Sequence, residues 1–126
     1  MSPSECHEAF VRAVVDKDGA GVRAALRNGL DVNFVDREGR FALHYAAVHG
    51  DGAAARALLD GGAQIDCRDR NGNTPLSNAV FYAEGRKEFI EFLLANGANP
   101  NIENLHGVSA ATLARSIANY DYSELF

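Results

Sequence analysis

Two stretches of the chain repeat one pattern: residues 69–80 read DRNGNTPLSNAV, and residues 36–47 read DREGRFALHYAA. Both begin with Asp-x-x-Gly, which is typical of a tight turn because glycine adopts backbone angles that other residues avoid. Thr74-Pro75 then predicts the start of a helix, since threonine caps free backbone N–H groups and proline is tolerated in the first turn. The repeat predicts a turn followed by a helix.

A second helix is predicted in the downstream half of each copy. Residues 56–66 (RALLDGGAQID) align with residues 91–101 (EFLLANGANPN) at an offset of 35, whereas the upstream halves align at an offset of 33. The later copy therefore carries two extra residues within 80–85. Fainter copies stand at 25–33 and 104–114, and glycines that favour a helix end stand at Gly29, Gly62 and Gly97.

These residues resemble the ankyrin repeat, whose pattern is D-x-x-G-x-T-P-L-H-x-A, a short turn, and a helix with L-L-x-x-G-A-x-x-N. Residues 69–101 match it almost fully, and residues 36–66 match it with Phe41-Ala42 in place of Thr-Pro. The resemblance implies an all-α solenoid of four stacked helix-turn-helix units joined by turn tips. The expected units are about 2–35, 36–68, 69–103 and 104–126, within a single domain of residues 1–126.

Other local signals agree with stacked helical units. Ser2-Pro3-Ser4-Glu5 predicts a capped helix start with a capping-box glutamate. Phe89, Ile90, Leu93 and Leu94 recur at helical spacing. No single unit can bury its apolar face alone, so stacking is expected to form one elongated core. Residues 122–126 are expected to end partway through a second helix, as a capping repeat of a complete small protein would.

Composition and charge exclude several classes of protein function. The net charge of −5 argues against a nucleic-acid binder and fits either a cytosolic protein or one that meets a basic partner. The start lacks the pattern of a signal peptide, and no apolar run approaches the length of a membrane span. Cys6 and Cys67 are too few for a disulfide framework, so we expect buried or half-buried reduced thiols in a cytoplasmic protein.

No pattern for catalysis or metal binding is found. His44 and His49 are five residues apart, off the face that a helical metal pair uses. Asp36, Asp66 and Asp69 stand at turn positions, where we expect them to brace turns. By resemblance, His44 is expected to hydrogen-bond the neighbouring turn. We therefore expect no catalytic residue, no metal, no cofactor and no enzymatic activity.

The resemblance implies a concave binding surface made by the turn tips and the exposed face of each first helix. Two alternatives are open for its arginines, which either pair with local aspartates in solvent or clamp carboxylates of a partner. Two are also open for Phe81 and Tyr82, which either anchor a partner or pack between units. The expected partner-binding residues are Arg37, Glu38, Arg40, Val48, His49, Arg68, Arg70, Asn71, Asn73, Phe81, Tyr82, Arg86 and His106.

The partner implied by the resemblance is another protein, bound by a chain that is a monomer when free. Residues 74–81 and the tail LARSIANYD (113–121) look like small bacterial ankyrin proteins, some of which are immunity proteins that neutralise a toxin. A cytosolic scaffold or regulatory adaptor is the alternative. The insertion in AVFYAEGRK (79–87) is expected to lengthen a helix by half a turn or to widen a loop that carries Arg86 outward.

Overall fold

The computed structural model describes residues 2–117, 122 and 125–126, and it confirms the all-α class. Within these residues there are seven helices and no strand. No helix among them is long and apolar enough to cross a membrane. The helices are α1 (Pro3–Val15), α2 (Gly19–Arg27), α3 (Ala42–His49), α4 (Gly52–Asp60), α5 (Pro75–Tyr82), α6 (Glu88–Ala95) and α7 (Ala110–Ser116).

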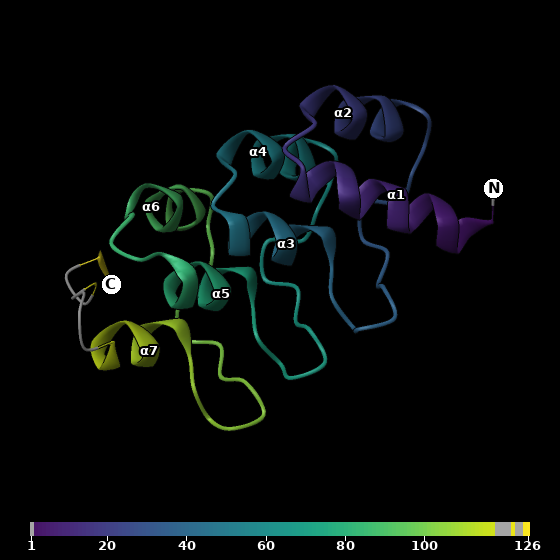
Figure 1. Ribbon diagram of the computed structural model, residues 1–126. Helices are drawn as coiled ribbons and strands as arrows, with labels where there is room; N and C mark the ends of the chain where they lie inside the picture. The colour runs from purple at the N-terminus through teal and green to yellow at the C-terminus, as the bar shows by residue number, and fades with distance from the viewer. Residues whose placement is uncertain (1, 118–121, 123–124) are drawn as a thin grey trace.

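The helices form two layers that run side by side along the solenoid (Figure 1). One layer is the row α1, α3, α5 and α7, in which each helix packs against the next. The other layer holds α2, α4 and α6, each packed against the preceding helix of the first row. We call the first row the inner layer, because the long connecting loops project from its side of the molecule (Figure 1). The result is the predicted stack of helix-turn-helix units.

Most helix starts are capped by a side chain, as the sequence predicts. Ser2 and Glu5 form the complete capping box at α1. The Thr74 hydroxyl accepts the Ser77 N–H at α5, and Ser109 caps α7 in the same way. Aspartates cap α2 and α4. Each cap satisfies an N–H group that has no partner inside the helix, which typically stabilises a helix by about 1 kcal/mol.

One continuous core runs through the stack. Ala42, Ala46 and Ala79 are almost completely buried, and such small side chains let neighbouring inner helices approach closely. Larger side chains fill the space between the layers: Leu43, Leu58, Leu76, Ile90 and Leu93 are at most 1% exposed. The predicted core position of Leu93 is confirmed, and so are the buried Cys67 and the half-buried Cys6.

The two inserted residues widen a loop and do not lengthen a helix. α5 has eight residues, the same length as α3, so the half-turn extension is wrong. The connection after α3 is residues 50–51, whereas the connection after α5 is residues 83–87. Within the expected tail helix, residues 122–126, residues 123 and 124 lie outside the described residues, and Tyr122 is a buried side chain.

Candidate binding surface

Three turn tips border the inner helices, and each is built around one side-chain oxygen. Asp36 Oδ1 accepts the N–H groups of Glu38 and Arg40 at 3.0 and 2.9 Å. Asp69 Oδ1 likewise accepts the N–H groups of the residues two and four positions later, both at 2.9 Å. Asn104 Oδ1 accepts the corresponding N–H groups at 2.8 and 3.0 Å. The carboxylates are thus occupied by the turn backbone, as expected for residues that brace turns.

Adjacent tips lie close together, and glycine makes that approach possible. Gly72 has a φ of +80°, in the left-handed region, and a Cβ there would lie 3.0 Å from the Leu105 nitrogen. The Leu105 N–H donates to the Asn71 carbonyl oxygen at 3.0 Å. The Asn104 amide donates to Asn73 Oδ1 at 2.9 Å. Asn71 and Asn73 therefore help to join one tip to the next.

His44 joins the start of α3 to the tip of the following unit. Its side chain is completely buried. Nδ1 accepts the Phe41 N–H at 3.1 Å, so the proton is on Nε2, which donates to the Asn73 carbonyl oxygen at 2.8 Å. Burial lowers the pKa of His44, and the bond to Asn73 opposes this only in part. The predicted structural role of His44 is confirmed, with a neutral ring that serves both neighbours.

Two of the tip arginines are structural, an outcome that neither alternative from the sequence described. Arg68 Nη2 donates to the Glu103 carbonyl oxygen of the next tip at 2.8 Å. Arg70 Nη2 donates to the Arg37 carbonyl oxygen of the preceding tip at 2.6 Å. Both guanidinium groups therefore bind backbone oxygens of neighbouring tips and hold the row of tips together.

The remaining charged tip residues are exposed, and their side chains do not join one tip to the next. Arg37 lies 3.9 Å from the Glu8 carboxylate, with both side chains largely in solvent, so the pair contributes little to stability. The Arg40 guanidinium lies 5.7 Å from the centre of the Tyr45 ring. Glu38 and His106 are exposed at the tips of the second and fourth units.

Phe81 and Tyr82 stand out of the inner layer at the end of α5. They are 62% and 42% exposed, and their rings meet edge to face with centroids 4.9 Å apart. Burial of both between units is therefore ruled out. One repeat earlier, Val48 and His49 are half-buried on α3. The exposed apolar surface of this helix row is thus largest at the third unit.

The widened loop after α5 turns back onto its own helix. Glu84 and Gly85 both have positive φ, +50° and +89°, which is uncommon for a glutamate. The Arg86 side chain donates to the carbonyl oxygens of Ala83 and Tyr82, at 3.0 and 3.3 Å, and so caps the end of α5. Arg86 is exposed, but its side chain folds back onto α5 and does not extend outward as the sequence led us to expect.

The loop also receives the C-terminal region of the chain. The Gly85 N–H donates to the hydroxyl of Tyr122, whose side chain is 1% exposed. The sequence reasoning missed this contact. The only signal for it is that the chain departs from the repeat at two places, the insertion and the aromatic tail. The insertion therefore has a structural role beside any role in binding.

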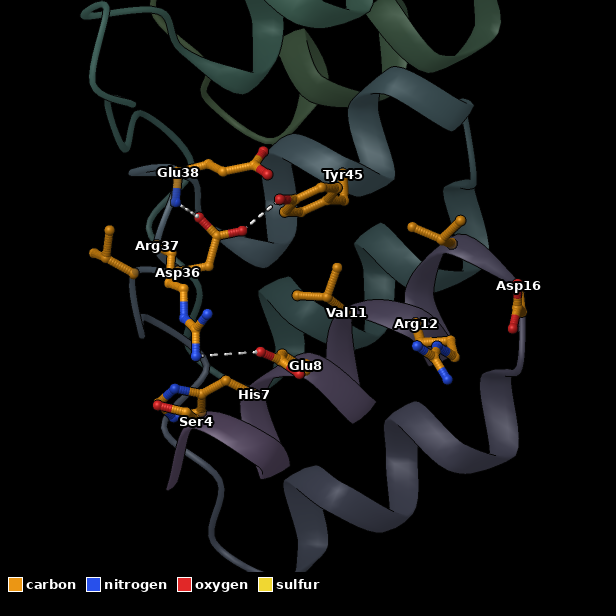
Figure 2. A pocket seen from close by; sticks show the side chains of 12 residues that line it. Ser4, His7, Glu8, Val11, Arg12, Asp16, Asp36, Arg37, Glu38 and Tyr45 are labelled. Carbon is orange, nitrogen blue, oxygen red and sulfur yellow. Dashed lines mark hydrogen bonds and ion pairs between the residues drawn. The ribbon is translucent and has the colours of Figure 1, made fainter. Parts of the chain in front are cut away.

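A hollow of about 780 Å³ lies at the N-terminal end of the inner surface (Figure 2). Its walls are α1 and the tip of the second unit, and Tyr45 of α3 closes one side. The sequence reasoning missed α1 as part of the surface, because α1 carries no repeat motif. Along α1, however, Ser4, Glu8, Val11 and Val15 recur at helical spacing, which could have indicated one exposed face.

The tyrosine at this hollow is held by the tip. The Tyr45 hydroxyl donates to Asp36 Oδ2 (Figure 2). Burial, the hydrogen bond to Asp36 and the nearby charge of Glu38 raise the pKa of Tyr45 to about 12. Tyr45 is therefore protonated at neutral pH and fixes the tip against α3.

The family model that describes ankyrin repeats, in three copies, matches residues 10–104. The chain belongs to the ankyrin-repeat family. A search of curated proteins found no match. Ankyrin repeats are protein-binding modules, so the surface made by the inner helices and the tips is the place where a protein partner is expected. Within the described part of this ankyrin-repeat chain, no group of three His, Cys, Asp or Glu side chains is placed to hold a metal ion.

Proposed function

We propose that this ankyrin-repeat chain is a cytoplasmic, monomeric inhibitor that binds one partner protein through its inner-helix surface, as an immunity protein binds its toxin. The observation that supports it most is the exposed ring pair of Phe81 and Tyr82. Two adjacent large aromatic side chains are costly to leave in water, and aromatic residues dominate the binding energy of many protein interfaces.

The anchor is preorganised, which supports tight binding. α5 is capped by Thr74 at its start and by Arg86 at its end. Leu76 and Val80 on the same helix are completely buried, so the helix cannot shift without disturbing the core. Little backbone ordering is then needed when a partner docks, and less of the interaction free energy is lost. Such a surface can inhibit by covering a partner's working surface.

The reactive side chains of the chain also favour binding over turnover. His44 uses both ring nitrogens for structural hydrogen bonds. Burial raises the pKa of the Cys67 thiol to about 12, so it is not a thiolate at neutral pH. The Tyr45 hydroxyl is engaged by Asp36. None of these three groups is poised as a nucleophile or a general base.

The test is affinity capture from the native host, followed by mass spectrometry of the captured proteins. We expect one stoichiometric partner, captured by the wild-type chain and lost with Phe81→Ala plus Tyr82→Ala. Hot-spot aromatic residues contribute about 2 kcal/mol or more each, so affinity should fall at least several hundredfold. Circular dichroism should be unchanged because neither ring belongs to the buried core. Glu91→Ala, on exposed α6 surface, is the control and should retain the partner.

A growth assay then tests inhibition itself. Expression of the captured partner alone should impair growth, and co-expression of the wild-type chain should restore it. Several weakly held partners, without growth rescue, would indicate an adaptor. Retention of the partner by the double-alanine variant would show that the rings are not the anchor.

A further inference from the structure

The hollow beside α1 combines an apolar lining with a charged rim. Its apolar side chains are Val11 and Val15 of α1, Val35 before the tip, and the ring of Tyr45. Val35 is 53% exposed, so its side chain adds apolar surface that a partner could cover. Figure 2 shows Val11 between α1 and the tip, with Tyr45 across the hollow from it. We call these residues and their charged neighbours the N-terminal groove.

The rim of the N-terminal groove is more acidic than basic. Four carboxylates, Glu8, Asp16, Asp36 and Glu38, line it together with two arginines, Arg12 and Arg37. The rim is therefore net negative, as is the whole chain, whose net charge is −5. A groove with walls of low dielectric constant concentrates the field of such charges at its mouth.

The carboxylates differ in what they already bind. Asp36 accepts the Tyr45 hydroxyl and two backbone N–H groups, and Glu8 lies near the Arg37 guanidinium. Glu38 is exposed, and Figure 2 shows its side chain extending from the tip toward Tyr45. Its negative charge is felt at the tyrosine, because it helps to raise the pKa of Tyr45. The Arg40 guanidinium also lies 5.7 Å from the Tyr45 ring centre, but Arg40 does not line the hollow, so the position next to Glu38 and Tyr45 inside the hollow suits a cation.

We propose that the N-terminal groove binds a segment of the partner protein that carries a lysine or arginine beside an aliphatic side chain. The cation pairs with Glu38 while its carbon stem covers the Tyr45 ring, and the aliphatic side chain covers Val11 and Val35. Long basic side chains suit this arrangement, since they bury their stems and keep the charge in water. The proposal rests on the proposed function, because it names the chemistry of one part of the partner.

The test uses the full chain labelled with ¹⁵N and a short synthetic peptide of leucine, alanine and lysine. We expect the amide signals of Val11, Val35, Glu38 and Tyr45 to shift on titration. A matched peptide with glutamate in place of lysine should leave these signals unchanged. No shift at these residues with millimolar lysine peptide, or equal shifts with both peptides, would overturn the proposal.

Two variants test the groove residues separately. Glu38→Gln keeps the size of the side chain and removes its charge, so the dissociation constant should rise roughly two- to fivefold, the effect of one exposed ion pair. Val35→Ser removes exposed apolar surface and should weaken binding by a similar factor without loss of helicity. Glu91→Gln, the same change on α6, should bind as the wild type does. Unchanged affinity in both groove variants would refute the assignment.

Failure of this inference can be told apart from failure of the proposed function. Capture of the native partner is compared between two variants. One is Glu38→Gln plus Val35→Ser, and the other is Phe81→Ala plus Tyr82→Ala. If only loss of the rings releases the partner, the proposed function stands and the groove inference fails. If neither chain, nor the wild type, captures a stoichiometric partner, the proposed function fails while the peptide titration still decides the groove.

Discussion

Replacement of His44 by leucine is expected to weaken the stack at the junction of the second and third units. The variant leaves the Phe41 N–H without its ring partner, whereas the Asn73 carbonyl oxygen loses the ring but keeps the Asp69 N–H at 2.9 Å. A buried backbone group without a partner costs about 1–3 kcal/mol. Phe41 and Asn73 are themselves half-buried, so water reaches them in part and the lower end applies. The free energy of unfolding should therefore fall by about 1–3 kcal/mol, mainly because of the Phe41 N–H.

The loss should also depend on pH, with a definite sign. Burial lowers the pKa of His44 in the folded chain below the unfolded value of about 6.5. At pH values between these two pKa values, the unfolded chain binds a proton that the folded chain does not bind. Stability contributed by the neutral ring is complete above about pH 6.5 and falls as the pH drops toward the folded-state pKa. The slope is at most about 1.4 kcal/mol per pH unit for one proton.

The assay is urea unfolding followed by far-UV circular dichroism at pH 7.5 and at pH 5.5. The wild type should lose more stability than His44→Leu does between the two pH values. His44→Gln keeps a hydrogen-bond donor and an acceptor but cannot titrate. It should therefore be more stable than His44→Leu and lack the pH dependence of the wild type. His106→Gln, at an exposed tip, is the control. Equal pH dependence in the wild type and His44→Gln would refute the assignment of a buried neutral ring.

Three further substitutions test other contacts by the same unfolding assay. Leu93→Ala should cost about 2–5 kcal/mol because the side chain is completely buried, and a loss below 1 kcal/mol would place it outside the core. Tyr122→Phe removes the hydroxyl that binds the Gly85 N–H, so it should cost about 1 kcal/mol; no change would show that the loop is held by the ring alone. Arg70→Met keeps the stem but loses the bond to the Arg37 carbonyl, which is exposed, so the loss should stay below about 1 kcal/mol. A larger loss would mean that the tip row unfolds as a unit.

Much of the fold followed from the sequence by itself, because its signals are local. Asp69 and Gly72 specify a turn through bonds within four residues, and Thr74 caps the helix that follows. The 33-residue offset placed the helix pairs, and the apolar spacing identified Leu93 as core. Such features depend on backbone angles and on bonds between near neighbours, which a short stretch of residues largely decides.

The binding surface was decided by tertiary structure, because its contacts join residues about one repeat apart. The Arg68 guanidinium reaches the Glu103 carbonyl oxygen, 35 positions away, and no local pattern shows whether an arginine will do so or extend into solvent. The exposure of Phe81 likewise depends on how closely the neighbouring helices pack. The sequence alone determined which units stack; the stacking itself then decided which side chains are used within the protein and which remain available to a partner.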